Sequence, residues 1–214
     1  IGDKTDLHAQ GYFSYDSKKS GGSTVSHLRF GKEPIKSSYL VYSTDYVSCN
    51  NKSFINHFDN MLDGLKDNGT FVLNCPWSIE ELEENLPNRV KRYLAENNIK
   101  FYIINANKIA NDIGLGNRIN MIMQTAFFKL TNVIPFEEAV KYLKEYIKNL
   151  YGKKGDEVVN MNYNAVDKAT EDLIKIEIPN HWLDAKEKVN TVSEELPEFV
   201  REIQIPMAKL EGDK

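Results

Sequence analysis

Residues 12–24, which read YFSYDSKKSGGST, and residues 25–31, which read VSHLRFG, together predict a β-hairpin. Apolar and polar residues alternate on both sides of a short polar segment, and aromatic and β-branched types are frequent, as in half-buried strands. The polar segment contains the glycines and lysines of a tight turn. We therefore expect a strand, a turn and a second strand in this part of the sequence.

The predicted turn has the composition of a phosphate-binding site. Its residues are Ser17, Lys18, Lys19, Ser20, Gly21 and Gly22. Unhindered glycine amides, hydroxyls and ammonium groups can converge on one anion. The same residues would also form an ordinary solvated loop, in which glycines supply positive φ and lysines keep the strand edge soluble. The spacing matches neither the P-loop nor the dinucleotide fingerprint, so the residues alone leave both interpretations open.

Helical and strand patterns alternate in the middle of the chain. Residues 53–66 have the apolar spacing of a helix, and residues 70–74 and 100–104 are apolar runs typical of buried strands. The segment between those two strands contains two helices, the first capped by Ser78 and divided from the second by Pro87. Residues 39–42 and 45–49 predict two more strands. This order predicts a three-layer α/β/α domain with a mostly parallel sheet, which is mixed because it includes the N-terminal β-hairpin.

The last third of the sequence predicts helices and then a tail. Residues 118–130 are apolar nearly all round, as in a helix buried between the sheet and a neighbouring domain, and residues 135–151 and 158–176 predict two further helices. From Pro179 onward, three prolines and many charges interrupt the apolar pattern. We expect an α/β domain over residues 1–178 and an extended tail or interdomain linker over residues 179–214, held to a surface by Trp182 and Phe199.

Composition limits the class of protein. The 214 residues are 41% hydrophobic and carry a formal net charge of −4, and the lysines alternate with glutamates. These features are typical of a soluble globular domain and argue against nucleic-acid binding. No apolar run predicts a membrane span, and the first residues lack the features of a signal peptide. We expect a cytoplasmic protein with no membrane partner, and the start at Ile1 indicates a fragment of a longer chain.

The chemistry-bearing side chains do not form a recognisable active site. Cys49 and Cys75 lie 26 positions apart and are expected to be small buried hydrophobes rather than zinc or iron–sulfur ligands. The four histidines lack metal-ligand spacing and no nucleophile motif is present, so we predict no catalytic residue and no metal site. His27 shares a predicted strand face with Arg29, and an inward, hydrogen-bonded histidine fits it as well as a functional one. Asn105 ends a predicted strand, where open α/β sheets often place ligand groups, but it fits a helix cap equally well.

Three blocks of sequence, in order, resemble the gamma-type domain of the pyruvate:ferredoxin (flavodoxin) oxidoreductases. The first is residues 11–31, and the second is residues 66–77, with KDNGTFVLN followed by Pro76 and Trp77. The third, residues 105–120, contains Asn105-Ala106 and ends in GLGNRIN. Its G-x-G does not continue as a dinucleotide fingerprint. The blocks are spread over most of the first 160 residues, so the set is specific even though each block alone is not.

The resemblance implies a role within a larger enzyme. Members of this 2-oxoacid oxidoreductase family oxidatively decarboxylate pyruvate on thiamine diphosphate with Mg²⁺, pass electrons through iron–sulfur clusters to ferredoxin or flavodoxin, and release acetyl-coenzyme A. Those cofactors would lie in other domains of the same enzyme. The isolated domain is therefore expected to be inactive.

For this chain, the resemblance implies help in binding coenzyme A and in closing over the active site. Lys18, Lys19 and Arg29 would neutralise its phosphates, while Ser17, Ser20, Gly21 and Gly22 would donate hydrogen bonds. Asn105 and Arg118 are further candidate ligand residues. One alternative is a structural docking module with no ligand of its own. A second, a stand-alone α/β enzyme, is disfavoured because a nucleotide fingerprint and an acid–base pair are both missing.

Overall fold

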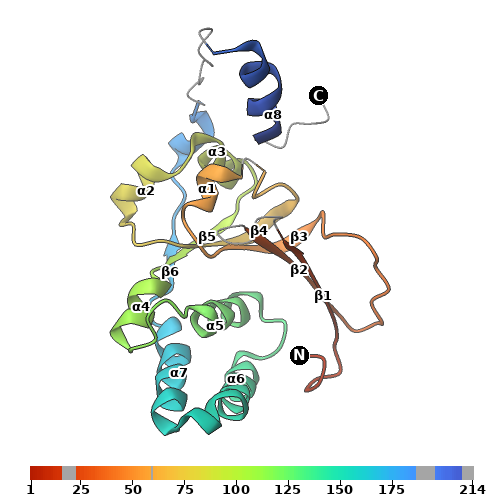
Figure 1. The fold of residues 1–214 in the computed structure, drawn as a ribbon, viewed down its shortest axis with the longest axis vertical. Helices are drawn as coiled ribbons and strands as arrows, with labels where there is room; N and C mark the ends of the chain where they lie inside the picture. Colours follow the sequence, from red (N-terminus) through yellow and green to blue (C-terminus); the bar gives the residue numbers. More distant parts are fainter. Residues whose placement is uncertain (16–22, 59, 187–195, 209–214) are drawn as a thin grey trace.

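The computed structural model describes residues 1–15, 23–58, 60–186 and 196–208, which contain two separate sheets (Figure 1). The first sheet pairs β1 (His8–Tyr15) with β2 (Thr24–Gly31) in antiparallel fashion. The second has the order β3-β4-β5-β6 and consists of β3 (Thr44–Cys49), β4 (Leu65–Asn74), β5 (Lys100–Ile104) and β6 (Ile174–Ile176). β3, β4 and β5 are parallel, and β6 runs antiparallel to β5.

Helices cover both faces of the four-stranded sheet, so the predicted three-layer α/β/α fold class is confirmed. One layer contains α1 (Phe54–His57), α2 (Ile79–Asn85) and α3 (Asn88–Glu96), and the other contains α4 (Ala106–Asp112), α5 (Asn120–Thr131), α6 (Phe136–Tyr151) and α7 (Asp156–Ala169). Because side chains alternate along a strand, Phe71 and Phe101 point to the first layer, while Val72 and Ile104 point to the second. Figure 1 shows the two layers above and below the sheet.

The predicted hairpin is confirmed, but it does not join the larger sheet. Within the described residues, β1 and β2 pair only with each other. The larger sheet is mixed for a different reason, which is the antiparallel strand β6. The sequence predicted a helix up to Ile176, whereas α7 ends at Ala169 and the chain returns to the sheet. The return buries Ile176 in the core between the sheet and the first helix layer, and this packing outweighs the local preference for a helix.

Several local predictions are confirmed because their signals are local. Residues 45–49 form most of β3. The Ser78 hydroxyl accepts a hydrogen bond from the Glu81 amide, and the Glu81 carboxylate accepts one from the Ser78 amide, which makes a complete capping box. Pro87 divides α2 from α3 as expected.

Two predictions between residues 39 and 66 are wrong. Residues 39–42 form no strand, and Tyr39 and Tyr42 are largely exposed. The helix expected over residues 53–66 is reduced to the single turn of α1. Gly64 has a φ of +81°, and a Cβ there would lie 2.1 Å from the Tyr42 carbonyl oxygen. The chain therefore turns tightly against residue 42 before Leu65 begins β4, and the helix cannot continue.

The segment after the sheet packs on the first helix layer. It contains the 3₁₀ turn η2 (Asn180–Asp184), and after residue 195 come a π-helical turn, η3 (Val200–Gln204), and α8 (Ile205–Ala208). The sequence predicted that Trp182 holds this segment to a surface, and Trp182 does anchor it, but as a 2% exposed member of the core beneath α3. Phe199 is largely exposed. The division of the chain at residue 178 stays a prediction.

Candidate functional site

The hairpin turn predicted to bind phosphate lies outside the described residues. This applies to Ser17, Lys18, Lys19, Ser20, Gly21 and Gly22. The described strands on either side are in register up to Tyr15 opposite Thr24. Residues 16–23 therefore connect two strand ends that are paired with each other.

Arg29 is hydrogen-bonded within the chain. Its guanidinium donates to Gln10 Oε1 at 2.9 Å and to the carbonyl oxygens of Tyr39 and Leu40 at 2.7 and 2.9 Å. It also lies 4.9 Å from the centre of the Tyr39 ring. Arg29 is five positions beyond Thr24, about 17 Å along an antiparallel strand. The structure thus places Arg29 away from the strand end that leads into the turn, where it fastens residues 39–40 onto β2.

His27 has a structural partner as well. Its Nδ1 accepts a hydrogen bond from the Val41 amide at 3.2 Å. The hydrogen-bonded alternative considered for this histidine is therefore the one that the structure contains.

Asn105 lies at the carboxyl end of β5 and caps α4. Its Oδ1 accepts a hydrogen bond from the Lys108 amide at 3.0 Å. Arg118 lies in the exposed loop after α4, and its backbone amide donates to the Leu115 carbonyl. No hydrogen bond or ion pair in the described part of the chain joins Arg118 to Asn105.

A residue to which the sequence analysis gave no role, Asn74, organises the carboxyl edge of the sheet. Asn74 ends β4 and is almost fully buried. Its Nδ2 donates to the Asn50 carbonyl at 2.9 Å and to Asn107 Oδ1 at 2.8 Å, and its Oδ1 accepts from the Ala106 amide at 3.0 Å. One amide therefore ties together the chain segments that leave β3, β4 and β5. The sequence contained one signal for this role, which is a polar residue at the end of an otherwise apolar strand.

The helix connections change faces at this same edge. The chain leaving β4 passes to α2 in the first layer, whereas the chain leaving β5 passes to α4 in the second. Ligands of open α/β sheets commonly bind in the crevice where the connections diverge. In this domain Asn74 bridges that position with its hydrogen bonds. Two further polar residues, the half-buried Asn105 and the exposed Asn107, directly follow β5 at this edge of the sheet.

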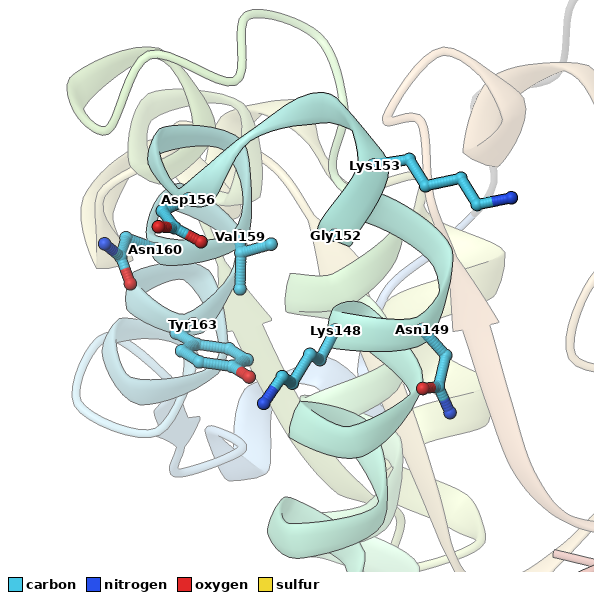
Figure 2. A pocket seen from close by; sticks show the side chains of 8 residues that line it. All are labelled: Lys148, Asn149, Gly152, Lys153, Asp156, Val159, Asn160 and Tyr163. Carbon is cyan, nitrogen blue, oxygen red and sulfur yellow. The ribbon is translucent and has the colours of Figure 1, made fainter.

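One described concavity lies elsewhere, on the second helix layer. It is a hollow of about 630 Å³ between the end of α6, the 3₁₀ turn η1 (Gly152–Lys154) and the start of α7. Figure 2 shows the side chains that line it. It is lined by Lys148, Asn149, Gly152, Lys153, Asp156, Val159, Asn160 and Tyr163. None of the residues that the sequence analysis proposed as ligands of coenzyme A lines this hollow. Its polar side chains are solvent-exposed or half-buried, so no set of fixed donors marks it as a ligand site.

The cysteines are buried thiols. Burial raises the pKa of Cys49 to about 11, and burial also raises the pKa of Cys75. Both are therefore protonated at neutral pH and behave as small hydrophobes, as predicted. Among the described residues there is no group of three His, Cys, Asp or Glu side chains that could hold a metal ion. In the same part of the chain, no helix has the length and apolarity to cross a membrane.

Comparison with known proteins gives a consistent family. The sequence profile of the pyruvate ferredoxin/flavodoxin oxidoreductases matches residues 1–171. The chain is 53% identical over 214 residues to pyruvate:ferredoxin oxidoreductase of Moorella thermoacetica and 53% identical over 213 residues to pyruvate-flavodoxin oxidoreductase of Enterobacter agglomerans. Both matches cover 100% of this chain but only 18% of the relative. The chain thus spans less than a fifth of these relatives.

Solved structures show the same fold at low sequence identity. The pyruvate oxidoreductase subunit PORC of Thermotoga maritima matches with a TM-score of 0.61 and 17% identity, over 80% of this chain and 83% of that one. A 2-oxoglutarate:ferredoxin oxidoreductase of Magnetococcus marinus matches with a TM-score of 0.54 and 19% identity, over 86% of this chain and 27% of that one. The matched profile and the full-length identities show that this chain belongs to the pyruvate ferredoxin/flavodoxin oxidoreductase family.

Proposed function

We propose that this chain is one domain of a pyruvate:ferredoxin or pyruvate:flavodoxin oxidoreductase. The observation that carries the proposal is the 53% identity to such an enzyme along the whole chain, which corresponds to 18% of that enzyme. The complete enzyme would convert pyruvate and coenzyme A to acetyl-coenzyme A and CO₂, with two electrons passed to ferredoxin or flavodoxin. The other domains would be its permanent partners.

The remaining cofactors would belong to those other domains. An iron–sulfur cluster requires about four cysteine ligands, and this chain has two, both buried in its own core. We therefore assign the iron–sulfur clusters, and with them thiamine diphosphate and Mg²⁺, to the rest of the enzyme. The domain itself is proposed to be inactive alone.

The role proposed for this domain is to bind part of coenzyme A and to close over the active site. Lys18 and Lys19 would neutralise phosphate charge, and Ser17, Ser20 and the amides of Gly21 and Gly22 would donate directed hydrogen bonds. The Magnetococcus marinus 2-oxoglutarate:ferredoxin oxidoreductase, which shares this fold, was solved with coenzyme A and succinyl-coenzyme A bound, and this supports the proposed role. Arg29 is the weakest member of the set, since its guanidinium is bound to Gln10 and to the backbone of residues 39–40.

Isothermal titration of the chain with coenzyme A and with dephospho-coenzyme A, at low and moderate salt, tests the proposal. The expected result is binding that weakens with salt and weakens further when the 3′-phosphate is missing, because the lysines act through charge. The matched variants are Lys18→Ala/Lys19→Ala and, as a control on two exposed lysines of the loop that follows β2, Lys32→Ala/Lys36→Ala. If the dissociation constants were the same for both ligands and for both variants, the proposal would be contradicted and a docking module without a ligand would be favoured.

A further inference from the structure

The two faces of the β1–β2 hairpin carry different side chains. Residues directly opposite each other in an antiparallel pair lie on the same face, and successive residues alternate between faces. By the observed register, one face, which we call the polar face, carries Gln10, Tyr12, Ser14, Val25, His27 and Arg29. The other, which we call the apolar face, carries Ala9, Gly11, Phe13, Tyr15, Thr24, Ser26, Leu28 and Phe30. None of these eight residues is charged.

The polar face is covered by the chain itself along much of its length. Arg29 donates to the carbonyl oxygens of Tyr39 and Leu40, and the Val41 amide donates to His27. Gln10 Nε2 donates to the Ser37 carbonyl at 2.6 Å. These contacts hold residues 37–41 against Gln10, His27 and Arg29, so this part of the polar face has its partner within the domain, whereas Tyr12 and Val25 are 56% and 49% exposed.

The apolar face is covered only at its base. Phe30 packs on Phe127 of α5, with ring centres 5.8 Å apart, and Phe127 packs on Tyr46 of β3 at 5.3 Å. The face is thus continuous with the interior of the domain at this end. Toward the turn, Phe13, Leu28 and Tyr15 are 51%, 47% and 73% exposed.

Gly11 makes this exposed strip continuous. A Cβ at Gly11 would lie 3.4 Å from Leu28 Cδ2 and 3.8 Å from Phe13 Cε2. The two side chains therefore close over the glycine and form one apolar surface. A contiguous apolar surface of this kind on a soluble domain marks an interaction site, whereas single exposed apolar residues need no explanation.

We propose that the apolar face of the hairpin docks on an apolar surface of another domain of the same enzyme. This inference rests on the proposed function, in which the chain is one domain among several. More than four fifths of each relative lies outside the segment that this chain matches. In the proposed enzyme, these other domains would be a large, covalently linked partner for the apolar face. The absence of charge on the described apolar face argues against nucleic acid and against an anionic membrane surface, both of which require basic side chains.

The position of the apolar face suggests what the docking would do. The strip runs from the core at Phe30 to the strand ends at Tyr15 and Thr24, which lead into the turn proposed to bind coenzyme A. A two-stranded hairpin alone is marginally stable in water. Docking one face would hold the two strands in a fixed place between two domains.

Hydroxyl-radical footprinting of the full-length enzyme, read by mass spectrometry, tests the docking directly. The hairpin supplies two matched pairs: Phe13 (51% exposed) with Tyr12 (56%), and Leu28 (47%) with Val25 (49%), each pair with one residue on either face. With each rate normalised to that of the same residue in unfolded enzyme, Phe13 and Leu28 are expected to react about fivefold more slowly than their partners, as half-exposed side chains do when they enter an interface core. Equal rates within the pairs would overturn the proposal.

Dilution and two variants complete the test. Protection that disappears on about hundredfold dilution would identify a second copy as the occupant and overturn the proposal, because a linked domain stays bound by its effective concentration. Leu28→Asp is expected to restore the reactivity of Phe13, while Val25→Asp is expected to leave it protected. The same response to both variants would also contradict the docking. Footprinting is done without coenzyme A, so its result is independent of the coenzyme A titration. If Phe13 were unprotected while the titration showed salt-sensitive binding, the docking would be rejected and the proposed function would stand.

Discussion

The two outer parts of this domain, the β1–β2 hairpin and residues 180–186, are attached in opposite ways. Residues 180–186 lie against α3 through the buried Trp182 and several polar contacts. The hairpin is packed at its base through Phe30, and half of the surface of Phe13 and Leu28 is exposed. One segment is anchored in the domain by a fully buried tryptophan, and the other has a strip of apolar surface that the domain leaves exposed. The difference separates what stabilises this domain from what connects it.

Glu83 of α2 is the centre of the first attachment. Its Oε2 accepts a hydrogen bond from Trp182 Nε1 at 2.6 Å and lies 3.1 Å from His181 Nε2, while its Oε1 is 2.9 Å from Lys91 Nζ. Partial burial raises the pKa of Glu83, but hydrogen bonds from Trp182, Lys91 and His181 outweigh it and lower the pKa to about 2. The carboxylate is therefore held charged where it joins the segment to both helices.

Trp182→Ala should have the largest effect on stability. Removing a large, 2% exposed side chain leaves a cavity beneath α3 and is expected to lower the free energy of unfolding by about 3–5 kcal/mol. Urea unfolding of the chain measures the change. The adjacent Leu183 is 48% exposed, and Leu183→Ala is expected to cost no more than about 0.5 kcal/mol. Similar losses for both variants would show that residues 180–186 are not packed as described.

Glu83→Gln should have an intermediate effect. The glutamine keeps the shape but removes the negative charge facing Lys91, whose side chain is only 6% exposed, and we expect a loss of about 1–3 kcal/mol. The neighbouring exposed residue supplies a control, since Glu84→Gln is expected to change the free energy of unfolding by less than about 0.5 kcal/mol. If the two glutamines behaved alike, Glu83 would not be an anchor.

The contribution of Glu83 should depend on pH. Its pKa in the folded chain is about 2, below the ordinary 4.5, so its stabilisation is complete above pH 4.5 and is lost as the pH falls toward 2. The difference in unfolding free energy between wild type and Glu83→Gln should therefore narrow over this interval. Trp182→Phe removes the indole donor and moves the folded-state pKa of Glu83 toward 4.5, so the loss should be smaller and should be complete at a higher pH. A difference that stays constant with pH would contradict the assigned pKa.

Phe13→Ala should have the smallest effect on the chain by itself. Because Phe13 is half exposed, we expect the free energy of unfolding to fall by no more than about 1 kcal/mol, close to that for Tyr12→Ala on the opposite face. In the full-length enzyme the two variants should separate, with Phe13→Ala the more damaging. Urea unfolding of the chain and thermal melting of the enzyme supply the two measurements. A large loss in the chain alone would mean that the hairpin is already packed internally.

The sequence predicted the parts of the fold whose causes are close together in the chain. The capping residues Ser78 and Glu81 are three positions apart, and the apolar runs of β4 and β5 identify buried strands without knowledge of their neighbours. Alternation alone was sufficient to predict the hairpin. Strand β6 was missed because three residues carry no periodicity and pair with β5 only through tertiary packing.

The candidate site was less accessible for the same reason. Asn74 acquires its role from the Asn50 carbonyl and from residues 106 and 107, which lie 24 to 33 positions away. Arg29 was predicted from its charge to meet a phosphate, whereas its guanidinium is bound to backbone carbonyls 10 and 11 positions further on. Side chain to backbone contacts over such separations leave no pattern in a single sequence.

The most direct test of the account is the Michaelis constant of the full-length enzyme for coenzyme A after Lys18→Ala/Lys19→Ala. Loss of two charge-assisted contacts is expected to raise KM for coenzyme A at least about tenfold, while KM for pyruvate stays unchanged. Lys32→Ala/Lys36→Ala should leave both constants at the wild-type value. An unchanged KM for coenzyme A in the first variant, or an equal rise in both KM values, would contradict the assignment of this domain to coenzyme A binding.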